Sequence, residues 1–529
     1  MGATITASNN AVGQELASVL PQDNKHWYQR AHLIKLSLIV LSLCQFSSTN
    51  GYDGSIMNGL QSLPSWQEFM KSPTGAWLGF INAIYWLGMM VCSPMASVIS
   101  NKYGRKTNVW VGYLCLVIGV ALQTAAPNDI TFLLARLFLG ACSAFFSNSV
   151  PLLINEIAYP THRGIVSAVF NTGWYCGSII AALVTFGTRN YSSSWGWRLP
   201  SLFQILLPIV ALPGFILCPE SPRWLVAQGR VEEARAIICA HHAGGDESAP
   251  LLNYEMLEIE TAINAEKLAK HSSSYADMSK TKGNRWRLAI SISLAIFSQW
   301  SGNGVVSYYL AIVLTTVGIT GATDQLLINL GLQIWNLIFA VGAAFSVDKL
   351  GRRALFLASA STMLVSYIIV TGLSGSFAQT GHAATGVAVV PFLFVFFAGY
   401  DIALTPLLVS YTCEIWPYTL RTKGLTVTWV TAISAIFFNT FVNPIALEAI
   451  GWKYYFVFII VLIAMGITTY FFYPETRGYS LEQMAFIFDG EDAAVMEPEK
   501  TKERAASVAH SVEVEGGAKT NTVTYEEKV

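Results

Sequence analysis

The sequence predicts an all-α integral membrane protein built from twelve transmembrane helices. Of the 529 residues, 53% are hydrophobic and 12% are charged, and the mean hydropathy is +0.46. Soluble domains carry about 25% charged residues. Stretches of about 20 apolar residues, the length that crosses the hydrocarbon core of a bilayer as a helix, recur along the chain. Charged motifs that occur twice in the same order indicate two similar halves.

Twelve apolar stretches are expected to span the membrane. Six of them precede a polar segment that begins at residue 219, and six follow it. The expected spans are 33–57, 76–99, 107–125, 129–154, 165–187, 198–217, 287–314, 325–347, 353–376, 386–411, 423–447 and 452–473.

The polar segments divide the chain into five parts. These are a cytoplasmic N-terminal segment (1–32), a first six-helix bundle (33–218), a cytoplasmic linker with short amphipathic helices (219–286), a second six-helix bundle (287–473) and a cytoplasmic, largely disordered tail (474–529). The linker begins with PESPR and the tail with PETRG. Proline stops a helix and charge prevents re-entry into lipid, so both motifs end a half. Beyond about residue 490 the composition is typical of disorder.

The distribution of Lys and Arg predicts the orientation. Basic residues gather in the loops after even-numbered spans, which places these loops and both termini in the cytoplasm. The glycosylation sequon that begins at Asn190 lies in an odd-numbered loop and agrees with this orientation. The first 30 residues lack the apolar core of a cleavable signal peptide, so the first span is expected to serve as signal and anchor.

Composition also limits the partners of the protein. The net charge is −1, so no basic excess points to nucleic acid. The eight cysteines lie mostly inside expected spans and show no CxxC spacing. They are therefore interpreted as small core residues rather than disulfides or metal ligands.

Three charged motifs occur twice, about 250 residues apart. NKYGRK at 101–106 is matched by DKLGRR at 348–353, and the Pro-Glu motif at Glu220 is matched by that at Glu475. A glutamate followed seven residues later by an arginine ends both span 4 and span 10. Repeats in the same order predict an internally duplicated fold.

The repeated charges predict a cytoplasmic gate. Ion pairs among them would hold the two halves together in one state and open in the other. The alternative is topogenic, since basic residues stay inside wherever they are. The residues expected in this gate are Arg105, Glu156, Arg163, Glu220, Arg223, Arg352, Arg353, Glu414, Arg421 and Glu475.

The motif set resembles that of the sugar porter family of the major facilitator superfamily. It consists of NKYGRK, NEIAYPTHRG, PESPRWL, DKLGRR, EIWPYTLRTKG and PETRG, and the resemblance covers about residues 33–485. The variants QWSGNG, YTCEIWPYTLRTKG and GYDGSIMNG look most like fungal lactose and cellobiose or cellodextrin permeases. The resemblance implies two pseudo-symmetric six-helix bundles, a sugar site between them near mid-membrane, and alternating access.

Charged residues inside the expected spans are costly and need a reason. Arg136 in span 4 could approach and leave Asp53 in span 1, so that Asp53 binds a proton on one side and releases it on the other. Proton-coupled members of the family resemble this chain at both positions. The alternatives are a static salt bridge between the two spans, or an Asp53 lying in water at the outer end of its span. Asp401 in span 10 is a possible substrate contact.

A sugar site needs amides, hydroxyls and aromatic faces, because a polyol both donates and accepts hydrogen bonds. The cluster QWSGNG in span 7 suits a helix that bends around a substrate. The alternative for each lone asparagine is a contact between helices. The candidate binding residues are Asn171, Trp174, Gln299, Trp300, Asn303, Tyr308, Asn336, Trp429 and Asn439.

Matched to the family, Gln299 takes the place of the second of the paired glutamines in span 7, and Asn171 and Asn336 fall at polar positions of spans 5 and 8. The chain departs from the family at Ser298, which replaces the first glutamine, and at Val409, which replaces the tryptophan of span 10 in many glucose carriers. These replacements make room in the site.

The expected function is import of a disaccharide of the lactose or cellobiose type, coupled to protons through Asp53 and Arg136. A hexose or pentose transporter is the alternative, and a transporter-like sugar sensor is the alternative from another class. No cofactor, metal site or enzyme motif is expected. The expected partners are sugar, protons and the lipid bilayer, a monomer is expected to suffice, and the plasma membrane is the default location.

Overall fold

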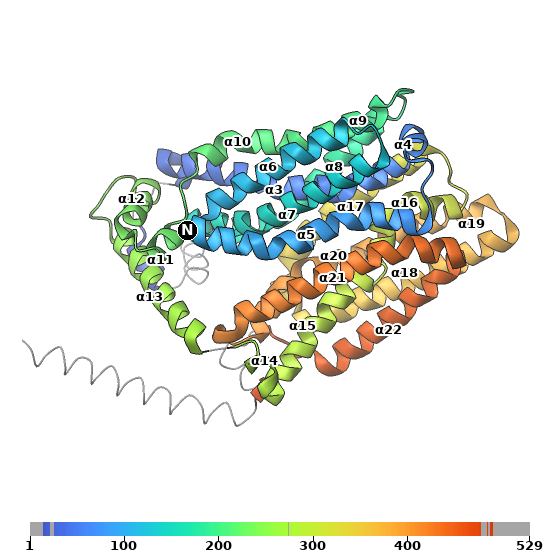
Figure 1. The fold of residues 1–529 in the computed structure, drawn as a ribbon. Coiled ribbons are helices and arrows are strands. Elements are labelled where there is room, and N and C mark those ends of the chain that lie inside the picture. The colour runs from blue at the N-terminus through green and yellow to red at the C-terminus, as the bar shows by residue number, and fades with distance from the viewer. Residues whose placement is uncertain (1–13, 22–25, 273, 478–483, 485–486, 490–529) are drawn as a thin grey trace, which may run out of the picture.

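The structure is a computed structural model that describes residues 14–21, 26–272, 274–477, 484 and 487–489, and the described residues contain helices and no strands. This confirms the all-α membrane fold. The helices, shown in Figure 1, are α2 (Gln14–Val19), α3 (Ala31–Gln61), α4 (Pro64–Met70), α5 (Gly75–Tyr103), α6 (Arg105–Thr124), α7 (Asp129–Ile157), α8 (Arg163–Thr188), α9 (Trp195–Leu202), α10 (Leu206–Leu217), α11 (Pro222–Ala227), α12 (Val231–His241), α13 (Pro250–Ser272), α14 (Asp277–Lys280), α15 (Lys282–Trp300), α16 (Asn303–Thr316), α17 (Ala322–Leu350), α18 (Arg352–Thr380), α19 (Ala383–Val387), α20 (Val389–Ile415), α21 (Tyr418–Ile450) and α22 (Tyr455–Phe472).

Short 3-10 turns extend several of these helices. They are Trp27–Gln29 before α3, Pro160–His162 before α8, Phe203–Ile205 between α9 and α10, and Gly451–Tyr454 between α21 and α22. Among the described residues, ten helical stretches are long and apolar enough to cross a membrane. One of them joins α21 and α22, and the seventh expected span is missing from the ten because it is broken into α15 and α16. The number of spans is twelve when α21 and α22 are counted separately and the broken seventh span is added.

The break in the seventh span lies inside the sequence cluster that was expected to bend. Gly302 follows α15 with φ of 99°, a left-handed conformation that favours glycine. A second irregularity lies in α16, where Tyr309 has a φ of −136° and a ψ of 28°. Both irregularities free backbone groups from the helical pattern, so other segments must satisfy them.

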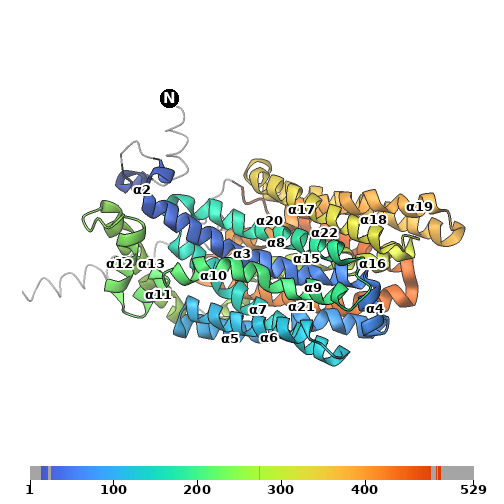
Figure 2. The same ribbon diagram turned by 90° about the horizontal axis from the view of Figure 1, so that it is seen from above.

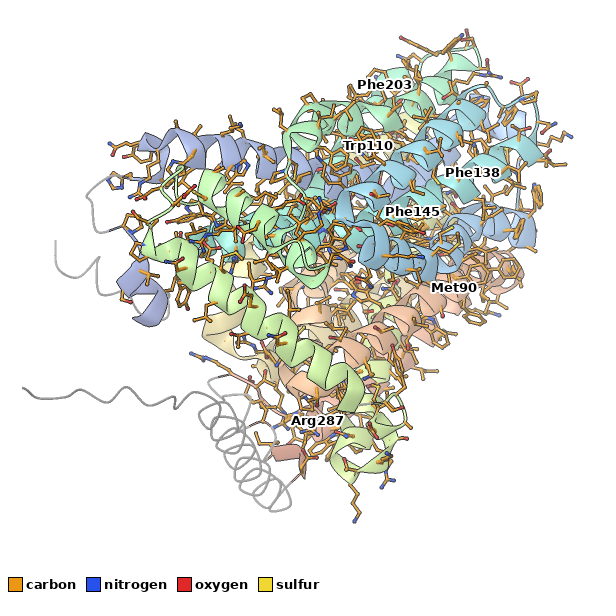
Figure 3. All side chains as sticks on the ribbon, turned by 60° about the vertical axis from the view of Figure 1, so that its left-hand side comes forward. Met90, Trp110, Phe138, Phe145, Phe203 and Arg287 are labelled. Atoms are coloured by element: carbon orange, nitrogen blue, oxygen red, sulfur yellow. The ribbon has the colours of Figure 1, made fainter. Side chains whose placement is uncertain are left out.

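The chain forms two halves that lie side by side, α3 to α10 and α15 to α22 (Figures 1 and 2). Between the halves α5 packs against α21, α8 against α17 and α3 against α16. Close approach depends on small residues: a Cβ atom on Gly79 of α5 would lie 2.3 Å from the carbonyl oxygen of Phe441 of α21. Further along, Ser434 of α21 contacts the sulfur of Met90, which Figure 3 shows where α5 meets the second half.

Four helices, α11 to α14, lie in the segment that was expected to be a linker. Helix α13 contains 23 residues and is therefore not short. In Figure 1 it runs from α11 and α12 beside the first half towards α14 at the base of α15, and it contacts α21. Helices α11, α12 and α13 have a small core of their own, around Leu225, Ile238 and Leu252. The end of the molecule that they cover is called the linker end below, and the opposite end the far end.

Candidate functional site

Asp53 lies inside the first half, on α3, and is completely buried. No described residue forms a hydrogen bond with either of its carboxylate oxygens. Arg136 of α7 donates instead from Nη1 to the main-chain carbonyl of Asp53, at 3.1 Å, and its guanidinium lies 4.7 Å from the centre of the Tyr85 ring. The two side chains are therefore neighbours without a salt bridge among the described residues. In the described part of the chain, the Asp53 carboxylate is neither salt-bridged nor exposed.

A second buried carboxylate lies between the halves. Asp401 of α20 is completely buried, and its Oδ1 accepts hydrogen bonds from the hydroxyl of Tyr175 of α8, at 2.6 Å, and from that of Thr405, at 2.8 Å. Its Oδ2 has no hydrogen-bond partner among the described residues. Tyr175 belongs to the first half and Asp401 to the second, so this contact joins the two halves. Sequence analysis did not single out Tyr175.

The polar residues around the break in span 7 lie against α21 and α20. Asn439 of α21 donates to the main-chain carbonyl of Gln299, at 2.7 Å, and Trp300 donates to that of Ala435, at 3.1 Å. Asn303 accepts a hydrogen bond from Ser307, at 2.6 Å. The half-buried side chains of Gln299 and Asn303 keep donor and acceptor capacity beyond these bonds.

The other expected binding residues are more scattered. Asn171 of α8 is exposed, whereas Asn336 of α17 is buried and its Oδ1 has no partner among the described residues. Trp174 packs on α3, because a Cβ atom on Gly54 would lie 2.8 Å from its ring. Tyr308 is buried against Trp86 of α5.

Trp429 of α21 is 47% exposed and lies about three helical turns closer to the linker end than Asn439. The structure therefore groups Gln299, Trp300, Asn303 and Asn439 around the break, and leaves Asn171 and Trp429 apart from that group.

The far ends of the halves are joined by neutral amides that sequence analysis did not single out. Asn58 of α3 donates to the carbonyls of Val306 and Ser307 in α16 and accepts from the N–H of Leu310, at 3.2 Å. Gln61, one turn further along, donates to the carbonyl of Tyr308, at 2.9 Å. These side chains satisfy backbone groups that the irregularity at Tyr309 frees. Their spacing of three residues on one helix face was the available sequence signal.

The repeated charges at the linker end form two equivalent sets. In the first half Arg105 pairs with Glu156, at 3.3 Å, and the carboxylate of Glu220 accepts the backbone N–H groups of Arg105 and Lys106, both at 3.1 Å. The glutamate therefore caps the N-terminus of α6, where the positive end of the helix dipole lies. Gly104, with φ of 102°, makes the cap possible, since a Cβ atom there would lie 2.5 Å from the Glu220 carboxylate.

The second half repeats this arrangement. Arg352 pairs with Glu414, at 3.0 Å, and the carboxylate of Glu475 accepts the N–H groups of Arg352 and Arg353, at 2.8 and 3.0 Å. Burial raises the pKa of the Glu475 carboxyl, but hydrogen bonds from the N–H groups of Arg477, Arg352, Arg353 and Thr476 outweigh this and lower it below the usual value. Each set joins helices of one half.

Of the other residues predicted for the gate, two contact the linker helices, one lies beside α22 and one lies in α21. Arg163 at the start of α8 lies 3.5 Å from Glu255 and 3.9 Å from Glu258 of α13, and Arg223 lies 3.2 Å from Glu258. The guanidinium of Arg353 lies over the ring of Tyr470. Arg421 lies in the first turn of α21. Glu156 and Arg163, which lie seven residues apart in one of the repeated motifs, have separate partners, Arg105 and Glu255.

Two further buried contacts fix the linker end. His242 lies 2.8 Å from the carboxylate of Glu255 through Nδ1, and 3.0 Å from the carbonyl oxygen of Ile157 through Nε2. Arg287, labelled in Figure 3 at the base of the second half, is 1% exposed and forms an ion pair with Asp489, at 2.8 Å. It also donates to the carbonyl of Ile415 at the end of α20, at 2.9 Å. The contact of Asp489 shows that the last described residues pack against the body.

Two apolar halves, with buried polar groups between them and charge sets at one end, are the architecture of a membrane transporter. The chain belongs to the sugar transporter family: the family profile described as "Sugar (and other) transporter" matches residues 38–488. It is therefore a transporter and not an enzyme.

Two similar proteins are named as sugar transporters. The high-affinity glucose transporter of Kluyveromyces lactis is 25% identical over 477 residues, which cover 86% of this chain and 85% of that one. The sugar transporter STL1 of Saccharomyces cerevisiae is 27% identical and covers 88% of this chain and 83% of its own. The membership predicted from the motifs is confirmed, and nothing in these relatives points to the lactose or cellobiose permeases.

Solved structures support the fold. The inward-open conformation of the xylose transporter XylE from E. coli matches with a TM-score of 0.69 and 22% identity, over 86% of this chain and 100% of that one. The same protein, described as a proton:xylose symporter bound to 6-bromo-6-deoxy-D-glucose, matches with a TM-score of 0.67 and 21% identity. The major facilitator fold is thus confirmed.

Proposed function

We propose that this chain imports a sugar together with protons and that Asp53 carries the coupling proton. The observation that carries the proposal is the environment of Asp53, a buried carboxylate with no hydrogen-bond partner among the described residues and with Arg136 held on its main-chain carbonyl. An unpaired buried charge costs several kcal/mol, so this arrangement favours the protonated acid. Movement of the guanidinium onto the carboxylate would favour release of the proton.

The contacts between the halves support an inward-facing state in an alternating-access cycle. Asn58 and Gln61 join the halves at the far end, and Gly79 of α5 lies against Phe441 of α21 there. The basic loops make the linker end cytoplasmic. The gate predicted at this end would then form between the halves in the outward-facing state, after the rigid sets around Glu220 and Glu475 approach each other.

We infer that the substrate is a monosaccharide, a hexose or a pentose. The relatives named for glucose and the structural neighbour named for xylose support this substrate class. A disaccharide is the second candidate, and Val409 favours it. This small side chain is 38% exposed, and it stands at the position where many glucose carriers of the family have tryptophan. The plasma membrane, cytoplasmic termini and a functional monomer remain part of the proposal.

Uptake assays in a host without its own sugar carriers test these assignments. Initial uptake of labelled glucose, xylose, cellobiose and lactose is measured at acidic external pH, with and without a protonophore. We expect glucose or xylose to enter and accumulate, and the protonophore and Asp53→Asn to lower accumulation at least about tenfold, because coupling is lost while exchange persists. The matched control is Asp129→Asn, at a half-buried carboxylate in the first turn of α7.

The outcomes separate the alternatives. Accumulation that survives both the protonophore and Asp53→Asn would overturn the proton coupling. Entry of cellobiose or lactose in place of monosaccharides would establish the second candidate, and specific binding without entry of any sugar would indicate a sensor.

A further inference from the structure

We propose that Asp401 is a second proton-binding residue of the transport cycle, and that its carboxyl controls the hydrogen bond joining the two halves at mid-membrane. The inference rests on the proposed proton-coupled transport. It starts from position: Asp401 lies within one residue of the middle of α20, and Tyr175, its partner at 2.6 Å, lies at the middle of α8. The contact therefore lies near the centre of the membrane and belongs to neither end.

The surroundings of Asp401 contain hydroxyl groups and no cation that pairs with it. From α8 it faces Tyr175, on its own helix it lies beside Tyr400 and Thr405, and Tyr308 of α16 lies beyond Tyr400. Within the described ranges no Lys, Arg or His forms an ion pair with Asp401. Asp53, in contrast, has Arg136 as a neighbour. The two carboxylates are separate groups with different surroundings.

The hydrogen-bond pattern matches a protonated carboxyl. Oδ1 accepts two hydroxyl hydrogens, whereas Oδ2 is buried and has no partner in the described part of the chain. Ionised, Asp401 would hold an unpaired charge in an apolar interior, which costs several kcal/mol after two hydroxyl bonds are counted. With the proton on Oδ2 the group is neutral, and the cost falls to that of one unpaired O–H donor.

Protonation of this residue must be linked to the arrangement of the halves, because the two partners sit on different halves. When the halves rock, Tyr175 moves relative to Asp401, and the carboxyl exchanges a phenol partner for water or sugar. A hydrogen bond to a charged carboxylate is about twice as strong as one to a neutral acid. The protonation state therefore sets the strength of the contact between halves, and by reciprocity the arrangement of the halves sets proton binding.

Counterflow of labelled sugar tests this linkage without requiring net coupling. Vesicles containing the full-length protein are loaded with the monosaccharide that the wild type carries, and exchange is measured with equal internal and external pH, stepped from about 5 to 8. In Asp53→Asn we expect the exchange rate still to change about tenfold over this range, since Asp401 titrates. In Asp53→Asn/Asp401→Asn the rate should be independent of pH, and Asp401→Glu in the same background should restore the dependence.

Tyr175→Phe in the Asp53→Asn background tests whether Asp401 acts by binding a proton or only by packing against Tyr175. It removes the donor and keeps the carboxyl, so the pH dependence should persist with a shifted midpoint. The proposal is overturned if Asp53→Asn exchanges sugar at a rate independent of pH, or if the double variant keeps the pH profile of Asp53→Asn. Proton influx during sugar uptake by the wild type, and its loss in Asp53→Asn, tests the proposed function separately.

Discussion

The two ends of the molecule are held by different chemistry. At the far end, neutral amides join the halves: Asn58 and Gln61 of α3 bond to the backbone of α16. At the linker end, carboxylates and guanidinium groups are plentiful, but the sets around Glu220 and Glu475 stay inside their own halves. Under the proposed alternating access, the contacts that break in each cycle would use groups with a small desolvation cost, whereas charges would hold together the parts that move as units.

Each charge set ties the start of one helix to the segment that ends the same half. Arg105 and Arg352 each begin a helix directly after a glycine with positive φ, and each lies beside a glutamate from the end of the half. The equivalence of the two sets follows from the duplication of the sequence. If the two halves rock as rigid bodies, as proposed, each half must keep its shape at these chain reversals, since otherwise the loops would bend instead of the halves moving.

The largest effect is expected from removing a charged cap at the linker end. Glu475→Ala takes away the acceptor of four backbone N–H groups, and hydrogen bonds to a charged group contribute about 1.5–3 kcal/mol each when broken singly. We expect a loss of about 3 kcal/mol in unfolding free energy, with both gate arginines displaced. Thermal unfolding of the purified protein in detergent measures it. Glu475→Gln, which keeps one acceptor oxygen, should lose less, and equal melting temperatures for all three proteins would contradict the role of the cap.

A smaller effect, on conformation rather than on folding, is expected at the far end. Asn58→Ala leaves the Leu310 N–H and two carbonyls of α16 without their partner, and should favour separation of the halves by about 2 kcal/mol. Hydrogen–deuterium exchange of α16 should accelerate by about 30-fold.

The matched control for this prediction is Asn108→Ala. Asn108 is a buried asparagine with two hydrogen bonds that remain within the first half, to Phe145 and Ser149. Its replacement should lower stability without exposing α16. Equal exchange of α16 in both variants would show that Asn58 does not hold the far end closed.

The comparison of the two ends also shows what sequence alone could predict. The spans, the break at Gly302 and the duplicated motifs followed from hydropathy, glycine content and repeats, which are local or periodic signals. A charge in an apolar stretch must avoid lipid, so the sequence singled out Asp53 but left open whether it is buried or lies in water.

Partners between distant helices did not follow from the sequence. Helix periodicity defines which face a residue lies on and not what it meets, so the contact of Tyr175 with Asp401 had no local signal. The repeated motif placed Glu156 and Arg163 near the same end without predicting their partners, which are Arg105 and Glu255 in the folded chain.

An ion pair inside a charge set is expected to contribute less than the cap. Arg352 and Glu414 are 13% and 27% exposed and lie 3.0 Å apart. A double-mutant cycle with Arg352→Gln and Glu414→Gln should give a coupling free energy of about 1 kcal/mol. The exposed pair Arg230 and Glu233 of the linker, treated in the same way, should couple by about 0.3 kcal/mol. Equal coupling in the two cycles would mean that the gate pair is an ordinary surface contact.

The smallest effect is an acid dependence that belongs to the linker end. The pKa of Glu475 is lower in the folded protein than its usual value of 4.5, because four backbone N–H bonds outweigh burial. A group with a lowered folded pKa adds stability that is complete above the unfolded pKa and is lost as the pH falls through the folded pKa. The melting temperature of the wild type should therefore decrease more steeply below about pH 4.5 than that of Glu475→Gln. The free energy of unfolding lost in this way should be less than about 1 kcal/mol, because the Glu475 carboxyl is partly exposed to water. Parallel melting curves would show that the cap remains intact when Glu475 is protonated, so that its geometry rather than its charge holds the start of α18.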